Sequence, residues 1–263
     1  MDFQLEQDLS IIKYIMIFFV SYLSNLFSSI SGGGAGLIQL PSLLILGIPY
    51  YKSLAIHKIA TVALGLGGTT RNFTNLRNHS IKIIQLLVFG IPGVLLGASI
   101  VNYLSEKYLY ILLSIFSILL GIYSFLKPNL GMKNINKLNS TFSMIKFNFA
   151  VFLIAVLNGS ISSGSGLLVT ILLIKTFGID FLTAISITFL SVGIFWNAVG
   201  AIALSKIGSL PLNILLILII GSFLGGISGA HLSNLKGNKL IKKFFTFLCF
   251  LIGFTLLFKV WNN

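Results

Sequence analysis

Residues 28–41 read SSISGGGAGLIQLP and lie within a run, from Tyr14 to Tyr51, that contains no Asp, Glu, Lys or Arg. About 20 apolar residues are enough to cross a bilayer as a helix. The run is longer than that, and a group of glycines interrupts it. We therefore expect a helix within the membrane that breaks at the glycines and resumes beyond them.

The composition of the whole chain agrees with a membrane location. Of its 263 residues, 56% are hydrophobic and 9% are charged, and the mean hydropathy is +1.00, whereas soluble domains carry about 25% charged residues. Further charge-free runs, at 147–174, 181–205 and 207–230, are apolar on every helical face and do not alternate as barrel strands do. The sequence predicts an all-α polytopic membrane protein.

The net charge of +13 belongs mainly to the connections between apolar segments. Basic residues in short loops are typical of membrane proteins, so the expected partner is the lipid bilayer and not nucleic acid. Sixteen of the eighteen basic residues are lysine, and Asn and Ile are abundant, which favours an AT-rich bacterial genome. We expect a multi-pass protein of the bacterial inner (plasma) membrane, and the sequence leaves its oligomeric state open.

Eight apolar segments are long enough to span a membrane. They lie near residues 11–30, 53–74, 82–103, 108–126, 145–161, 181–204, 210–233 and 241–259. Two shorter segments, 36–49 and 166–178, each follow a glycine cluster and reach only about 20 Å, against about 30 Å for the hydrocarbon core. The sequence predicts eight long spans and two short half-helices led by glycine.

The two halves of the chain repeat each other at a nearly constant offset. Residues 34–37, GAGL, recur as GSGL at 164–167, an offset of 130. Matches at offsets of 129 and 132 join three more pairs of segments: 55–56 with 184–185, 97–102 with 229–234, and 121–127 with 253–259. We interpret this as a tandem duplication. Its parts are a first transmembrane repeat at 1–127, a linker at 128–144 and a second transmembrane repeat at 145–263.

The relative orientation of the repeats depends on whether the short segments cross the membrane. If they cross, 12 of the 18 basic residues fall on one side; if they are re-entrant, the division is 10 to 8. Positive charge accumulates on the cytoplasmic side. The count favours crossing segments, inverted repeats, a cytoplasmic linker and periplasmic termini, while the re-entrant alternative stays open.

The glycine clusters are the candidate binding site. A cluster frees backbone N–H groups and begins a new helix whose positive dipole end faces the break, and two such ends form an anion site at a repeat interface. We expect the N–H groups of 33–36 and 164–166 to hold an anion. The predicted substrate-binding residues are Ser31, Gly32, Gly33, Gly34, Gly36, Ser162, Ser163, Gly164, Ser165, Gly166 and Asn197. The alternative is that small residues only let the helices pack closely.

The first cluster also carries a family resemblance. Residues 31–49, SGGGAGLIQLPSLLILGIP, with their degenerate copy in the second half, resemble the TauE/SafE sulfite exporter family, also called the 4-toluene sulfonate uptake permease family. The resemblance covers essentially the whole chain. It implies transport of sulfite, sulfoacetate and other organosulfur or carboxylate anions. The second copy departs from the pattern at Ser165 and lacks a proline matching Pro41, which bears on the substrate more than on the fold.

The acidic residues argue against catalysis. Asp2, Glu6, Asp8, Glu106 and Asp180 all fall outside the spans or at their ends. No carboxylate is therefore placed for a proton relay at the membrane midplane, an intramembrane metal site or an acid–base pair. We expect a protein that is not an enzyme and that uses no cofactor or metal.

Several other polar residues fall inside or near the spans. Lys58 and Arg71 lie one to two turns inside the second span, where they either snorkel to the headgroups or steer an anion from near the mouth.

His57 and His231 are interpreted as interfacial histidines. Asn197 lies mid-span beside Trp196 and bonds either a substrate oxygen or a neighbouring helix. Thr61, Thr188 and Ser191 are similar candidates.

The leading hypothesis is a secondary transporter of a small anion that works by alternating access between two duplicated halves. A passive anion channel is one alternative. A non-transport scaffold or assembly protein is another, and it would need no polar pocket at the midplane. The sequence does not distinguish import from export.

Overall fold

The computed structural model describes residues 11–46, 48, 50–70, 76–101, 103, 106–133, 141–205 and 210–262, and every regular element in these ranges is a helix. The first half contains α1 (Ile11–Ser31), η1 (Ala35–Leu37), α2 (Gln39–Ile45), α3 (Tyr50–Thr69), η2 (Arg77–His79), α5 (Ser80–Ile100) and α6 (Glu106–Leu126). The second contains α7 (Thr141–Ser160), α8 (Ser165–Phe177), α9 (Phe181–Thr188), the π-helical η3 (Phe189–Trp196), α10 (Asn197–Ser205) and α11 (Leu212–Asn262). The prediction of an all-helical protein is confirmed.

Five helices in the described residues are long and apolar enough to cross a membrane. They lie at 11–31, 77–100, 141–160, 181–205 and 212–258. The last is bent at Gly237, whose φ of 69° is outside the helical range and divides α11 into two helical parts. In each of the eight predicted apolar segments, most of the described residues are helical, and the count of eight spans stays a prediction.

The chain breaks at equivalent places in the two halves. After α1, the φ angles of Gly32 and Gly34 are 89° and 100°; after α7, Ser162 has φ 65° and Gly164 has φ 78°. Ser162 follows Gly32 by 130 residues, and Gly164 follows Gly34 by the same number. Gly34 and Gly164 precede η1 and α8 as left-handed N-cap residues. The offset seen in the sequence is therefore matched by a repeat of backbone conformation.

Each half packs its first helix against the other half. In one contact, a side chain at Gly97 of α5 would collide with the carbonyl oxygen of Val156 in α7. In the other, a side chain at Gly229 of α11 would collide with the carbonyl oxygen of Leu26 in α1. The same pattern recurs one turn earlier, with Gly93 against Phe152 and Gly225 against Tyr22. The glycines of α11 follow those of α5 by 132 residues, and the contacted residues of α7 follow those of α1 by 130. The α5–α7 and α1–α11 interfaces are therefore equivalent, with the two halves in exchanged roles.

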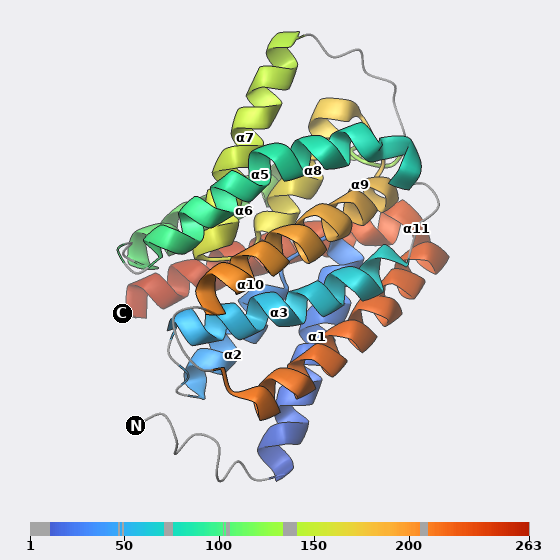
Figure 1. The fold of residues 1–263 in the computed structure, drawn as a ribbon. Helices are drawn as coiled ribbons and strands as arrows, with labels where there is room; N and C mark the ends of the chain where they lie inside the picture. Colours follow the sequence, from blue (N-terminus) through green and yellow to red (C-terminus); the bar gives the residue numbers. More distant parts are fainter. Residues whose placement is uncertain are drawn as a thin grey trace.

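Broken helices and interlocked halves together place polar backbone in the centre of the bundle. Figure 1 shows α1 and α7 entering from opposite ends and meeting the remaining helices near the middle. The last turns of α1 and α7 are buried. Trp196 is buried against α5, since its ring covers Gly90 and its Nε1 donates to the carbonyl oxygen of Leu86 at 3.0 Å.

Candidate functional site

The two glycine clusters are in direct contact. A Cβ atom on Gly33 would lie 2.7 Å from the backbone nitrogen of Leu167, and one on Gly166 would lie 2.9 Å from the carbonyl oxygen of Gly32. Contacts this short between Cβ and backbone cannot be relieved by turning a side chain. Glycine is thus required at both positions for the backbones to meet, and the expected approach of the two clusters is confirmed.

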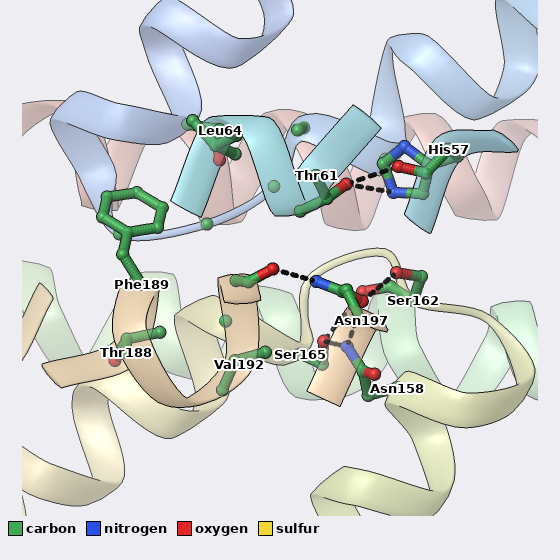
Figure 2. A pocket seen from close by; sticks show the side chains of 18 residues that line it. His57, Thr61, Leu64, Asn158, Ser162, Ser165, Thr188, Phe189, Val192 and Asn197 are labelled. Atoms are coloured by element: carbon green, nitrogen blue, oxygen red, sulfur yellow. Dashed lines mark hydrogen bonds between the residues drawn. The ribbon is translucent and has the colours of Figure 1, made fainter. Parts of the chain in front are cut away.

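A small polar cavity of about 30 Å³ lies between the clusters. It has room for about two water molecules. Its lining comes from both halves: Ser28, Gly32, Gly33, Gly34, Ala35, Gly36, His57, Thr61, Leu64, Asn158, Ser162, Ser165, Gly166, Thr188, Phe189, Val192, Gly193 and Asn197. Figure 2 shows His57, Thr61 and Leu64 of α3 facing Asn197, Val192 and Phe189 across it.

Eight of the eleven predicted site residues line this cavity. They are Gly32, Gly33, Gly34, Gly36, Ser162, Ser165, Gly166 and Asn197. Ser31, Ser163 and Gly164 do not. The hydroxyl of Ser31 instead lies 2.9 Å from the carbonyl oxygens of Phe27 and of Gly33 and donates its one proton within this turn.

Part of the expected set of N–H donors is already used. The backbone carbonyl oxygen of Ser28 accepts from the N–H groups of Gly32 and Gly33 at 2.8 and 3.0 Å. The N–H of Ser165 lies 3.4 Å from the carbonyl oxygen of Ser162. The expectation that Gly33 and Ser165 offer free N–H groups is therefore wrong, because the tight turns consume them. In the described part of the chain, no carbonyl oxygen accepts from the N–H groups of Gly34, Gly36 or Gly166.

Ser28 is a cavity residue that we did not predict. Its side chain is buried, and Oγ has no hydrogen-bond partner among the described residues. Asn158 follows it by 130 residues and also lines the cavity, with Nδ2 donating to Ser165 Oγ at 2.9 Å. Ser28 lies in the glycine-rich stretch 28–41, and the repeat offset of 130 leads from it to Asn158, so this signal was present in the sequence.

Lys58 occupies a different environment from the expected one. It is fully buried, and its Nζ donates to the carbonyl oxygen and Oδ1 of Asn158 at 2.6 and 3.1 Å, and to Oδ1 of Asn197 at 3.3 Å. Its stem passes close to Gly200, where a Cβ would lie 3.0 Å from Cε. Both earlier interpretations, snorkelling and steering from near the mouth, are wrong because the second half covers this face of α3. Arg71 lies outside the described residues.

His57 is likewise buried and not interfacial. Its Nδ1 lies 2.6 Å from Oε1 of Gln39, and its Nε2 faces the cavity near Thr61 Oγ1, at 3.4 Å. A Cβ on Gly36 would lie 2.9 Å from this Nε2, so glycine there leaves room for the imidazole. His231, by contrast, is exposed.

Asn197 forms hydrogen bonds both with Lys58 and with residues of the second glycine cluster. Its Oδ1 accepts from Lys58 Nζ, from Asn158 Nδ2 at 3.3 Å and from Ser162 Oγ at 3.5 Å. Of the other mid-span candidates, Thr61 and Thr188 line the cavity, whereas Ser191 is buried outside it. Asn197 therefore does bond neighbouring helices, and it does so at the edge of the cavity.

A small cavity lined by polar residues, between two interlocked halves of an apolar helical bundle, is an arrangement typical of a membrane transporter. The family model of the sulfite exporter TauE/SafE matches residues 17–256. The chain belongs to this family, which confirms the resemblance seen in its sequence. It is a multi-pass membrane protein of a transporter family.

Curated relatives agree with this class. The chain is 26% identical to "Probable membrane transporter protein ORF9" of a Sinorhizobium species, over 90% of this chain and 89% of the relative. It is 26% identical to "Probable membrane transporter protein YfcA" of Escherichia coli strain K12, over 86% and 83%. A "Probable membrane transporter protein" of Haemophilus influenzae is 24% identical over 93% and 94%. No solved structure gives a significant match.

Proposed function

We propose that this protein is a secondary transporter of small anions, of the sulfite or organosulfur class, which works by alternating access across the bacterial inner membrane. The observation that carries the proposal is the fully buried ammonium group of Lys58, which contacts Asn158 and Asn197 in the lining of the cavity. Within the described residues, its hydrogen-bond partners are neutral oxygens of Asn158 and Asn197, and no ion pair is found for it.

The charge of Lys58 favours an anion in the cavity. Taking an ammonium group out of water costs several kcal/mol even after relaxation, and three neutral acceptors offset only part of this cost. Asn158 and Asn197 both contact Nζ and both line the cavity. An anion bound there would face these two asparagines, with the cation behind them, and would supply the missing charge.

Neutral donors around the cavity suit the oxygens of a small oxyanion. The N–H groups of Gly34, Gly36 and Gly166 and the hydroxyl of Ser28 have no acceptor in the described chain. Gly166 lies in the first turn of α8, whose dipole places positive charge at that end. Sulfite and sulfonates carry several oxygens and can accept several of these bonds at once.

The two alternative functions fit less well. A passive channel needs a continuous aqueous path, whereas the cavity here measures about 30 Å³ and the two clusters touch beside it. A scaffold would gain nothing from a buried cation, since an apolar residue at position 58 would stabilise the fold better. Alternating access requires a site that closes between its two open states, and a cavity of this size agrees with such closure.

The proposed topology has eight long spans, two short half-helices and inverted repeats. The opposite entry of α1 and α7 in Figure 1 and the exchanged interfaces between the halves support this. The repeats are 1–127 and 145–263, and the linker, 128–144, is cytoplasmic. Accessibility labelling tests the orientation: in a Cys249→Ala background, Lys133→Cys should react with an impermeant maleimide from the cytoplasmic side. Labelling from the periplasm would reverse it.

Flux in proteoliposomes tests the function. Purified protein should give saturable uptake of sulfite or sulfoacetate, accumulated against its gradient when an ion gradient is imposed. A channel would equilibrate the anion without accumulation, and a scaffold would give no flux above empty liposomes. Lys58→Met, reconstituted in the same amount, is the matched control and should be inactive.

A further inference from the structure

His57 has a hydrogen-bond environment that determines which of its ring nitrogens carries a proton. The environment begins at Ser21, whose hydroxyl donates to the carbonyl oxygen of Leu218 at 2.8 Å. A hydroxyl has one proton, so Ser21 Oγ can only accept from its other neighbours. These are Ser222 Oγ at 3.0 Å and Gln39 Nε2 at 2.9 Å.

The side-chain amide of Gln39 is oriented by this constraint. Its Nε2 donates to Ser21 and lies 3.3 Å from Ser222 Oγ, so its Oε1 points at His57. The opposite amide orientation would leave Oε1 against a hydroxyl oxygen that has no proton to give. Because Oε1 only accepts, Nδ1 of His57 must be the donor across their 2.6 Å contact.

Among the described residues, no donor is committed to the other ring nitrogen, Nε2. Thr61 Oγ1 is 3.4 Å from Nε2, but the Thr61 hydroxyl donates at 2.7 Å to the carbonyl oxygen of His57 in the preceding turn. A neutral His57 therefore presents the lone pair of Nε2 to the cavity. On taking up a proton, the same atom becomes an N–H donor to Thr61 or to an ion in the cavity.

We propose that His57 Nε2 is the proton-binding site of this transporter and that it takes up one proton together with each anion. This inference rests on the proposed function and names its coupling ion. The proton comes from water on the side where the anion enters, forms the Nε2–H bond, and returns to water when the anion leaves. His57 is the titratable residue in the described lining of the cavity.

The charged surroundings make proton and anion binding cooperative. Lys58, the next residue, places a positive charge beside His57, and the other described lining residues, from α1, η1, α3, α7, α8, α9, η3, α10 and the two turns, contain no acidic or basic side chain. A second positive charge on His57 is unfavourable beside Lys58 until an anion lies between them. By linkage, the anion then favours protonation as much as protonation favours the anion.

Calorimetry in detergent tests the coupling. Isethionate and sulfoacetate are suitable probes because their charge is constant between pH 6 and 8. Titrating each probe in two buffers of different ionisation enthalpy gives the number of protons taken up per anion. Across this pH range, wild-type protein should approach one proton per anion, His57→Gln should take up none while still binding, and His231→Gln should match wild type.

Two variants of Gln39 separate coupling from a merely structural role. Gln39→Glu should move the midpoint of proton uptake to higher pH by about one unit, because a carboxylate stabilises the imidazolium; Gln39→Leu should move it to lower pH. These opposite shifts keep the test decisive if His57→Gln folds poorly, as judged by size-exclusion chromatography.

The possible results separate this inference from the proposed function. Binding of either probe without proton uptake, or unchanged uptake in His57→Gln, would overturn the inference and leave the anion transporter intact. If wild-type protein binds neither probe, the organosulfur class of the proposed function fails and the inference falls with it.

Discussion

The two halves of the protein share a backbone design but contribute different side chains to the cavity. Gly34 and Gly164 adopt the same left-handed conformation at the same place in each repeat. At the offset of 129 that aligns α3 with α9, however, His57 and Lys58 correspond to Ser186 and Ile187. The first half supplies both ionisable groups and the amide that contacts His57, Gln39, whereas the second half supplies the two asparagines that contact Lys58. Duplication thus preserved the break in the helix, while the chemistry of binding became divided between the copies.

The largest effect is expected from a side chain added where the two glycine clusters touch. Gly33→Ala would place a Cβ atom 2.7 Å from the backbone of Leu167 and would add strain at a φ of 153°. We expect transport to be abolished, measured as sulfite or sulfoacetate flux in proteoliposomes. Gly121→Ala, whose new Cβ would meet only side chains, at 3.2 Å or more, is the control. Comparable flux in both variants would show that the clusters need not touch.

Removing the cation should separate stability from function. In Lys58→Met we expect anion affinity to fall by about 30-fold or more, since a charged partner of the anion is lost. The anion-free protein should become more stable, by about 1–4 kcal/mol, because an uncompensated buried charge is replaced by an apolar chain. Thermal unfolding in detergent and probe titration measure the two effects. A variant that is both destabilised and able to bind would contradict the assigned role.

A smaller effect is expected at the unpartnered hydroxyl. Ser28→Ala should leave the anion-free protein as stable as wild type, since Oγ makes no bond in the described residues, and should weaken anion binding by about fivefold to tenfold. Ser31→Ala should do the opposite: its hydroxyl bonds within the turn, so stability should fall by about 1 kcal/mol. Equal effects of the two substitutions on binding would mean that Ser28 does not face the anion.

The smallest effect is expected at the counterpart of His57. Ser186 is buried and donates to the carbonyl oxygen of Leu182 at 2.8 Å, away from the cavity lining. Ser186→Ala should cost about 1 kcal/mol of stability or less and should leave the pH profile of transport unchanged. If that profile moved as it should in His57→Gln, the ionisable chemistry would not be confined to the first half.

Much of the site was predictable because many of its residues lie close together in the sequence. The two glycine clusters, their offset of 130 and the inclusion of Asn197 all follow from the sequence, and eight of the eleven predicted residues line the cavity. The three that do not, Ser31, Ser163 and Gly164, lie next to lining residues. Which residues of a tight turn face inward depends on individual φ angles, such as 65° at Ser162 and 78° at Gly164, that adjacent sequence does not specify.

The interpretations of Lys58 and His57 were wrong for a different reason. Counting turns from the end of a helix placed both near a membrane surface, and an isolated helix would let a lysine reach the headgroups. In the folded chain, Asn158 and Asn197, 100 and 139 residues further along, close over Lys58. Gln39, 18 residues before His57, folds back onto it through the short helix α2. Neither partner can be inferred from hydropathy.

The sequence by itself determined that this chain is helical, embedded in a membrane and internally repeated, with a break after the first helix of each repeat. Those properties are local, since apolar runs decide burial in lipid and glycines permit backbone that other residues rarely adopt. Only the tertiary structure decided that a histidine and two asparagines line one cavity and that a lysine packs against those asparagines. Polar side chains in an apolar bundle must find one another, and their positions depend on how distant helices pack.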